Sequence, residues 1–301
     1  MAERPHARSI LPDSLVSTAW LEKHLGLENL TVVDIRGYVK TTDLGDGRQH
    51  ADYVAARDEY DAGHVPGAVF VDWTTDITDP EAEIKAQLAQ AARFAAAMES
   101  RGIGDDTDVV IVDHTGGQFA TRLWWALRYY GHERTAVLDG GMGKWHDEGR
   151  PISSDAPAPK TLTFTPRLKT ELRRDAQDVL AASRDSTALI VDARDAGQYS
   201  GQTVRGSRGG HIPGAAHIPA KSLVNADGTW KTGEQIDRLL ADGGVTRDRP
   251  VIAYCNGGVT ATAVLFALHR SGHAAWANYD GSWNEWGERA DLPVETDAEG
   301  S

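Results

Sequence analysis

Short runs of apolar, β-branched residues alternate along the chain with longer segments in which apolar residues recur at helical spacing. Val32–Arg36 and Ile190–Arg194 are such short runs, and each ends in Asp-x-Arg. Ser14–Leu25 and Ala82–Ser100 have the helical spacing, and we expect a helix over each of them. Strands that alternate with helices predict an α/β fold, in which a parallel sheet carries helices on both faces.

The same pattern occurs twice in the chain. Val110–His132 aligns with Val251–His273 at a constant offset of 141 residues. Upstream, Gly-His-x-Pro-Gly-Ala recurs at an offset of 147 and Asp-x-Arg at an offset of 158. Matches in this order indicate an internal duplication, and the changing offset places the insertions in loops, which tolerate them.

The duplication divides the chain into two tandem domains. We place the N-terminal domain at residues 10–150 and the C-terminal domain at residues 168–296. Residues 151–167 are rich in proline, serine and threonine and follow neither periodicity, so we expect them to form the linker. A chain of 301 residues is also long for a single core.

The composition argues against several classes of protein. Lys and Arg number 31 against 44 Asp and Glu, and the net charge of −13 disfavours nucleic acids and anionic membranes as partners. No apolar run approaches the roughly 18 residues of a membrane span, and the first residues lack the apolar core of a secretory signal. The 11 histidines show no metal-ligand spacing, so we expect neither a metal nor another cofactor. A single cysteine cannot form an internal disulfide, which fits a cytoplasmic protein.

Cys255, the only cysteine, ends the second apolar run of the C-terminal domain, where open α/β sheets bind their ligands. Asn256-Gly257-Gly258 can turn the backbone tightly, and we expect a helix to begin near Thr260. Backbone N–H groups of this loop can converge on the sulfur and stabilise a thiolate, or an anion attached to it. The alternative is a small buried side chain with no chemical role.

The first repeat helps to choose between these interpretations. His114 stands at the position that matches Cys255, so the turn does not require a thiol, which favours a chemical role for the cysteine. A cysteine phosphatase needs an arginine after five intervening residues, to clamp the phosphoryl oxygens. Ala261 stands there, and the nearest downstream arginine is Arg270 at the far end of the expected helix. A loop without that arginine suits a single sulfane sulfur, held as Cys–S–S⁻ by backbone amides.

These residues resemble the tandem-domain rhodaneses, the family of thiosulfate and 3-mercaptopyruvate sulfurtransferases. The resemblance rests on CNGGVTA (255–261), on GHIPGA and VDAR before it, and on YDGSWNEW (279–286). It implies that Cys255 takes sulfur from a small-molecule donor as a persulfide and passes it to cyanide, a thiol or a reduced thioredoxin-like protein. It also implies an inactive N-terminal domain and a pocket between the domains, with Phe119 as a wall residue. The active-site loop would consist of Asn256, Gly257, Gly258, Val259 and Thr260.

Departures from the family pattern bear on the donor. Mercaptopyruvate enzymes usually carry a serine of a proposed proton relay where Gly257 stands, and the animal thiosulfate enzymes carry basic residues after the cysteine, where this loop is neutral. Gln198 takes the place of a substrate-gripping arginine, so we expect Arg205 or Arg208 to supply the cation that an anionic donor needs. The missing serine favours thiosulfate. A 3-mercaptopyruvate sulfurtransferase, and a persulfide carrier without multiple turnover, are the alternatives.

Comparison of the two repeats distinguishes residues expected to be structural from residues expected to contact the substrate. Trp283 has no tryptophan counterpart, because Met142 stands in the first repeat, and we expect it to shape the pocket. Arg194 either lines the pocket or forms a structural ion pair, since its counterpart Arg36 has no catalytic loop beside it. Residues that recur in both domains are expected to be structural: His64 with His211, Asp34 with Asp192, Asp139 with Asp280, and Trp145 with Trp286.

Overall fold

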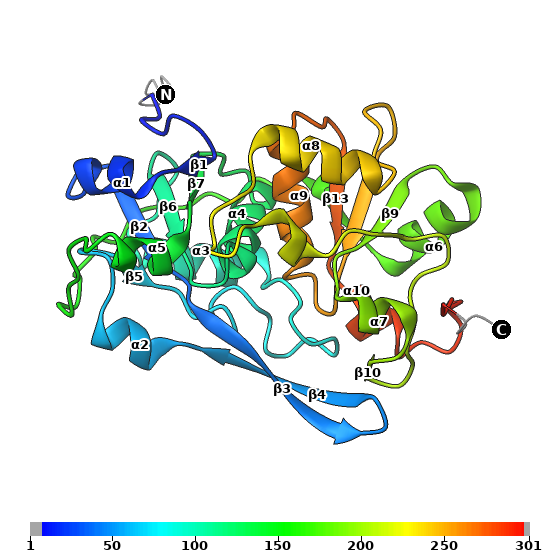
Figure 1. Ribbon diagram of the computed structural model, residues 1–301. Coiled ribbons are helices and arrows are strands. Elements are labelled where there is room, and N and C mark those ends of the chain that lie inside the picture. Colours follow the sequence, from blue (N-terminus) through cyan, green and yellow to red (C-terminus); the bar gives the residue numbers. More distant parts are fainter. Residues whose placement is uncertain (1–7, 298–301) are drawn as a thin grey trace.

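The chain forms two five-stranded sheets, one in each half, in a computed structural model that describes residues 8–297 of the 301 (Figure 1). The strands of the first sheet are β1 (Leu15–Val16), β2 (Leu30–Asp34), β5 (Val69–Phe70), β6 (Asp108–Val112) and β7 (Thr135–Leu138). Those of the second are β8 (Arg173–Arg174), β9 (Leu189–Asp192), β11 (Ala216–His217), β12 (Val251–Tyr254) and β13 (Trp276–Tyr279).

Both sheets are parallel throughout. The order is β1-β7-β6-β2-β5 in the first and β11-β9-β12-β13-β8 in the second, and all paired neighbours run in the same direction. The predicted duplicated α/β fold is therefore confirmed.

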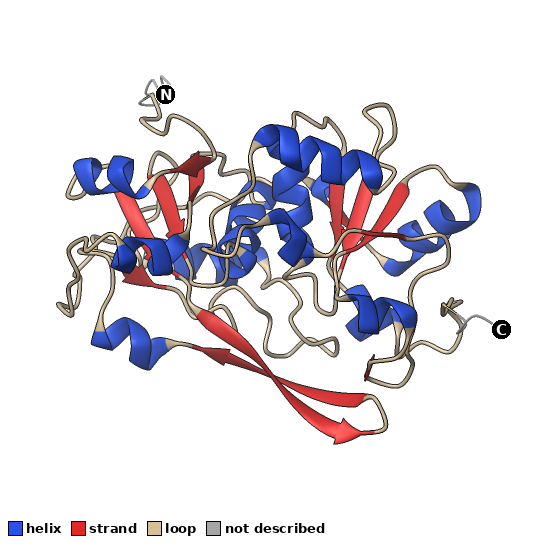
Figure 2. Ribbon diagram, viewed as in Figure 1, coloured by secondary structure: helices blue, strands red, loops and turns tan. Residues whose placement is uncertain are grey.

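Helices flank both sheets (Figure 2). The N-terminal domain has α1 (Thr18–His24), α2 (Arg57–Ala62), α3 (Ala91–Glu99), α4 (Gln118–Tyr129) and α5 (Gly141–Asp147). The C-terminal domain has α6 (Ala176–Asp185), α7 (Ala196–Ser200), α8 (Gly233–Asp242), α9 (Ala261–Arg270) and α10 (Ser282–Trp286), with 3₁₀ turns η1 (Thr170–Leu172) and η2 (Ala220–Leu223).

Successive residues of the central strands pack on opposite faces, as strand geometry requires. Val33 and Ile111 belong to a hydrophobic cluster that includes residues of α3 and α4. Val32 and Val110, one residue away from them, belong to a cluster that includes residues of α1 and α5. Strands buried on both faces explain why these segments read as continuous apolar runs.

The helices α4 and α9 pack against each other between the two sheets (Figure 1). One hydrophobic cluster runs from the first sheet through these helices into the second. Arg122 of α4 is buried there, and its guanidinium donates to the carbonyl oxygens of Gly258 (3.0 Å) and Ala86 (2.9 Å) and to the carboxylate of Asp280 (2.6 Å). A buried cation with all these partners holds the two domains together beside the Cys255 loop.

A long hairpin that the sequence analysis did not predict extends from the N-terminal domain beneath the C-terminal one (Figures 1 and 2). It consists of β3 (Gly37–Gly45) and β4 (Arg48–Ala55), which pair antiparallel. The short strand β10 (Val204–Arg205) of the C-terminal domain pairs with β4, with Arg205 opposite Gln49. The hairpin therefore carries a strand pairing between the domains.

The helix expected over residues 82–100 is shorter, because α3 begins only at Ala91. The preceding residues form a loop that docks on the C-terminal domain, where the N–H of Leu88 donates to Asp280 Oδ2 (3.0 Å). Ala86 in this loop has a φ of 68°, which is incompatible with a helix. Tertiary contacts thus override the local helical pattern.

Residues 151–167, the predicted linker, contain no helix and no named strand. The segment nevertheless packs on the N-terminal domain, since Phe164 is buried and the N–H of Arg167 donates to the carbonyl of Tyr130 (2.8 Å). Within residues 8–297, every helix is too short or too polar to cross a bilayer.

Candidate active site

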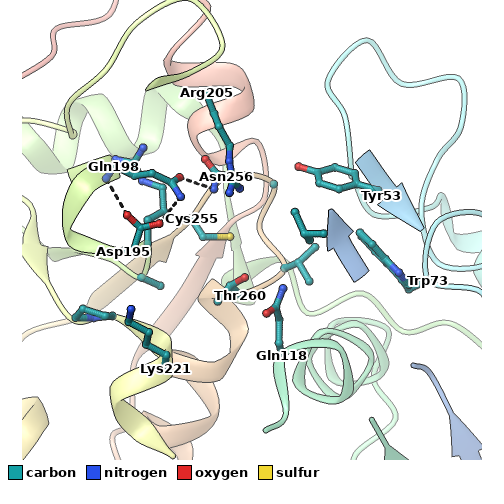
Figure 3. Close-up of a pocket in the computed structure, with 16 residues that line it drawn as sticks. Tyr53, Trp73, Gln118, Asp195, Gln198, Arg205, Lys221, Cys255, Asn256 and Thr260 are labelled. Carbon is teal, nitrogen blue, oxygen red and sulfur yellow. Dashed lines mark hydrogen bonds between the residues drawn. The ribbon is translucent and has the colours of Figure 1, made fainter. Parts of the chain in front are cut away.

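Cys255 directly follows β12, and its side chain points into a cavity of about 220 Å³ between the two domains (Figure 3). The residue is 3% exposed and its thiol is free. The carboxyl end of a central strand thus places the sulfur where α/β sheets bind ligands. From the N-terminal domain the cavity is lined by Val39, Tyr53, Trp73 and Gln118.

Backbone contacts with the segment after β13 fix the Cys255 loop. The N–H of Cys255 donates to Ser282 Oγ (3.1 Å), and its carbonyl accepts from the N–H of Trp283 (3.0 Å). The carbonyl of Asn256 accepts from the N–H of Asn284 (2.7 Å). The loop is therefore held on one side before any ligand binds.

Gly257 and Gly258 of the loop are subject to different structural constraints. Gly258 has a φ of 70°, and a Cβ there would lie 2.8 Å from the carbonyl oxygen of Asp280. Gly257 does not have a left-handed φ, but a Cβ on it would lie 2.8 Å from Ala86 Cβ of the N-terminal domain. The loop that docks from the other domain thus leaves no room for a side chain at position 257.

Six consecutive N–H groups, from Asn256 to Ala261, have no acceptor among residues 8–297. The helix α9 begins at Ala261, so the positive end of its dipole lies at the end of the same loop. Unpaired amides at this position are suited to bind an anion carried by the Cys255 sulfur.

In the N-terminal domain, equivalent backbone N–H groups donate to a carboxylate of the chain itself, that of Asp113. Asp113 accepts at 2.9–3.2 Å from the N–H groups of Thr115, Gly117, Phe119 and Ala120. At the offset of 141 residues, these donors correspond to Asn256, Gly258, Thr260 and Ala261. The counterpart of Asp113 is Tyr254, whose hydroxyl instead donates to Asp192 Oδ2 (2.6 Å). The second repeat therefore lacks the internal anion that fills the first.

His114, the counterpart of Cys255, contacts the ring of Tyr38 with 4.7 Å between the ring centroids. Burial lowers the pKa of His114. The two loops also differ in backbone, because Gly116 and Gly117 both have positive φ whereas only Gly258 does in the second loop. The N-terminal loop is thus built around a carboxylate and a neutral ring.

Besides Arg194, two cations face the Cys255 cavity, Arg205 and Lys221, and they approach it from opposite sides in Figure 3. Arg205 Nη2 donates to the neutral Gln49 Oε1 (3.3 Å), and its Nε has no partner among the described residues. Lys221 makes no ion pair or hydrogen bond with any residue between 8 and 297 through its ammonium. Burial lowers the pKa of Arg205, an effect that Tyr53 opposes. Both charges are available to an anionic ligand.

Arg194 also lines the cavity, but its charge is already compensated. Its Nη2 lies 2.6 Å from the carboxylate of Asp192, and its guanidinium stacks on the ring of Trp283 at 4.3 Å. Arg36 pairs with Asp34 in the same way at 2.9 Å. Arg194 therefore makes the structural ion pair that was the alternative for it. Trp283, which we expected to shape the pocket, is buried and is not among the lining residues, so it acts on the cavity only through Arg194.

Arg208 and Phe119, both expected at the pocket, lie elsewhere. Arg208 donates to four carbonyl oxygens at the end of α10 and beyond it, those of Trp286, Gly287, Arg289 and Leu292. Phe119 is buried against Trp73, with 4.9 Å between the ring centroids. Because α4 begins at Gln118, that residue faces the cavity and the next one turns into the core.

Gln198 stands where the family pattern has a substrate-binding arginine, and it supports the Cys255 loop instead of providing a positive charge. Its Oε1 accepts from Asn256 Nδ2 (2.8 Å), and its Nε2 donates to Asp195. Asp195 is the one acidic residue among the described residues that line the cavity, and it also caps α7. Through Gln198, α7 fixes the side chain next to Cys255.

The sequence analysis missed eight residues of the lining: Val39, Tyr53, Trp73, Gln118, Ala193, Asp195, Pro219 and Lys221. Val39 and Tyr53 lie on the hairpin β3–β4. A signal for this hairpin existed, because the repeat offset falls from 158 to 147 residues across it, which shows extra residues in the first repeat. Burial raises the pKa of Tyr53, so its hydroxyl faces the site protonated.

Residue pairs assigned to architecture make equivalent contacts in the two domains. The rings of His64 and His211 each contact a carbonyl oxygen of the preceding helix at 2.8 Å. The indoles of Trp145 and Trp286 donate to proline carbonyls at 2.8 and 2.7 Å. Across residues 8–297, no group of three or more histidines, cysteines or acids is arranged to hold a metal ion.

The chain is similar to known proteins over most of its length. The rhodanese-like domain family matches it twice, at residues 17–148 and 175–289. A 3-mercaptopyruvate sulfurtransferase of Escherichia coli is 35% identical over 283 residues, which cover 93% of this chain and 97% of that protein. A protein of Mycobacterium tuberculosis named "Putative thiosulfate sulfurtransferase" is 32% identical over 94% of this chain and 98% of its own.

Two further proteins are similar to the chain over most of its length. A sulfur carrier protein of Thermus thermophilus is 31% identical over 94% of this chain and 96% of its own length. The crystal structure of SseA from Escherichia coli, described under the rhodanese fold of 3-mercaptopyruvate sulfotransferases, superimposes with a TM-score of 0.79. It has 32% identity and covers 90% of this chain and 98% of its own.

Proposed function

The chain belongs to the rhodanese family and is a sulfurtransferase, and from this we propose that it moves the outer sulfur of thiosulfate to cyanide or a thiol through a persulfide on Cys255. The observation that carries the proposal is the set of N–H groups from Asn256 to Ala261, which have no acceptor among residues 8–297. Four of the six equivalent N–H groups in the first repeat bind the carboxylate of Asp113, which supports an anion-binding role for this loop.

The proposed cycle has two displacements at sulfur. The Cys255 thiolate attacks the outer sulfur of thiosulfate, the S–S bond breaks, and sulfite leaves with the bonding electron pair. The product Cys255–S–S⁻ carries one negative charge, which the loop amides stabilise. Cyanide then attacks the outer sulfur, thiocyanate leaves, and the thiolate is restored. Neither displacement requires a proton or a redox partner.

The charges of the cavity support an anionic donor. Arg205 and Lys221 face the sulfur from two sides, and neither is compensated by an acid within 4 Å among residues 8–297. A small dianion such as thiosulfate can use both cations at once. No serine or acid stands at positions 256–258 to protonate an organic leaving group, and sulfite needs none.

A second candidate donor is 3-mercaptopyruvate, the substrate in the name of the Escherichia coli relative. Its carboxylate can use the same two cations. A third possibility, a carrier that hands its persulfide to one partner protein, is favoured by the name of the Thermus thermophilus relative. We propose a cytoplasmic location for each, because a persulfide cycle needs the free thiol of Cys255.

The test is to incubate the protein with thiosulfate and weigh it intact. We expect a mass gain of one sulfur atom on Cys255, its loss on addition of cyanide, and ping-pong kinetics over many turnovers. Cys255→Ser should lose at least about 10³-fold in kcat/KM, since the nucleophile is gone. Retained turnover in that variant overturns the proposal. If kcat/KM is higher for 3-mercaptopyruvate than for thiosulfate, the donor is 3-mercaptopyruvate. If Cys255 is loaded with sulfur but does not turn over, the protein is a sulfur carrier.

A further inference from the structure

A second cavity of about 290 Å³ lies next to the Cys255 cavity, between the hairpin strand β4 and helix α10. Tyr53 and Arg205 line both cavities, so these two side chains form the wall between them. The rest of the lining consists of Gln49, His50, Ala51, Glu83, Lys85, Gly206, Asn284 and Glu288. Both domains therefore contribute to it, as they do to the Cys255 cavity.

The side chains of the shared wall are held by long hydrogen bonds to uncharged acceptors. Asn284 Nδ2 donates to the hydroxyl of Tyr53 (3.2 Å), and Arg205 Nη2 donates to Gln49 Oε1 (3.3 Å). Within the described part of the chain, residues 8–297, no carboxylate within 4 Å neutralises Arg205. A ligand in the second cavity therefore meets the same guanidinium that faces Cys255.

Besides Arg205, the second cavity presents one further positive and one negative side chain without a partner among residues 8–297. Among residues 8–297, the carboxylate of Glu83 and the ammonium of Lys85 have no ion pair and no hydrogen bond. The other acid of the lining, Glu288, is occupied, because it accepts from the N–H and the hydroxyl of Ser207. Glu83 and Lys85 are two residues apart on the loop that docks against the active-site glycines.

We propose that this second cavity binds the amino-acid part of a small zwitterionic thiol, the acceptor of the persulfide sulfur. Its carboxylate pairs with Lys85 and the Arg205 side of the wall, and its ammonium pairs with Glu83. Its sulfur reaches the Cys255 cavity past the edge of Tyr53. The inference rests on the proposed function and assigns its acceptor subsite.

Size separates the acceptor from the donor. Cavities that bind organic ligands span roughly 300–1,000 Å³. The Cys255 cavity, at about 220 Å³, is small for that class and suits a compact donor. The second cavity, at about 290 Å³, provides room beside it for the amino-acid part of an acceptor thiol.

The transfer step conserves atoms and charge. The acceptor thiolate, R–S⁻, attacks the outer sulfur of the Cys255 persulfide. A new S–S bond forms, the old one breaks, and the Cys255 thiolate leaves with the electron pair. The acceptor departs as R–S–SH or its anion, according to the protonation of the outer sulfur, so no oxidant or reductant is consumed.

The experiment measures single-turnover discharge of the thiosulfate-loaded protein by four thiols. L-Cysteine carries an ammonium and a carboxylate, 3-mercaptopropionate only the carboxylate, cysteamine only the ammonium, and 2-mercaptoethanol neither. Lys85→Glu should slow L-cysteine and 3-mercaptopropionate by about three- to tenfold, and Glu83→Lys should slow L-cysteine and cysteamine by a similar factor. Discharge by 2-mercaptoethanol and loading by thiosulfate should stay within about twofold.

The matched control is Lys160→Glu, the same charge reversal at an exposed linker residue. It should leave all four rates unchanged. Equal slowing of all four thiols by Lys85→Glu reflects only the general field on a thiolate and overturns the second subsite, as does no slowing at all. If the wild-type protein fails to load sulfur, the proposed function itself fails, and the two failures are thereby distinguished.

Discussion

The side-chain hydroxyls of Thr121 and Thr262 lie 2.9 Å apart, and the two residues occupy the same position of the internal repeat. Arg128 and His269 are also equivalent, and they meet near the C-terminal ends of α4 and α9, with 3.2 Å between Nη2 and Nε2. Contacts between equivalent residues are the mark of a two-fold axis, which here relates α4 to α9 within one chain. The duplicated domains thus pack like the subunits of a symmetric dimer.

The threonine pair couples the interface to the active-site loop. Thr262 donates its hydroxyl proton to the carbonyl of Val259 (2.6 Å), whereas the carbonyl of Gln118 lies 3.4 Å from the Thr121 hydroxyl. The shorter bond takes the Thr262 proton, so we assign Thr121 as the donor between the two hydroxyls. Thr262→Val removes the bond to Thr121 and the 2.6 Å bond to Val259, and it should cost about 1–3 kcal/mol. Thr121→Val removes the bond to Thr262 and only a long contact with the carbonyl of Gln118 (3.4 Å), so it should cost less. Urea unfolding of both single variants and the double variant tests this. Additive losses contradict a direct bond between the two side chains.

Arg205 and Arg208 should respond differently to the same substitution. Arg205→Met removes a cation from the cavity and should lower kcat/KM for the donor about 10- to 100-fold with little change in stability. Arg208→Met removes four bonds to carbonyl oxygens and should lower the free energy of unfolding without changing kcat/KM measured well below the transition. Steady-state kinetics and urea unfolding of the pair decide it. An Arg208 variant with the larger kinetic defect reverses the assignment.

Gly257 and Ala86 should be coupled through their contact. Gly257→Ser places a Cβ 2.8 Å from Ala86 Cβ and should cost about 1–3 kcal/mol by overpacking. Ala86→Gly makes room and also relieves the positive φ of 68°. The double variant should therefore regain most of the lost stability in thermal or urea unfolding. A Gly257→Ser variant as stable as the parent protein shows that the docking loop moves freely.

His269 should make stability depend on pH. Burial, and then the charge of Arg128, lower its pKa to about 4 from the ordinary 6.5. Between these values the unfolded chain binds more protons than the folded one, so the free energy of unfolding rises with pH through this window and falls on acidification. Urea unfolding at pH 5 and pH 7.5 should show a smaller difference for His269→Gln than for the parent protein. The exposed His146→Gln is the control and should leave the difference unchanged.

The repeat made the fold and the position of Cys255 predictable. Apolar periodicity reflects which faces are buried, and a duplicated pattern reports it twice. The segment before α3 shows the limit of that inference. Its apolar spacing is helical, yet Leu88 donates its N–H to Asp280 in the other domain, and no local pattern encodes that partner.

The sequence by itself determined the strand–loop–helix order around Cys255, because glycines, strand length and helix start are local properties of neighbouring residues. Only the tertiary structure decided which cations meet the sulfur. The strand β10, which contains Arg205, pairs with the hairpin strand β4, and the Arg205 side chain faces the cavity. The Arg208 side chain instead donates to carbonyl oxygens at the end of α10. That choice depends on partners 156 residues away for Arg205 and 78 residues away for Arg208, which come together only in the folded chain.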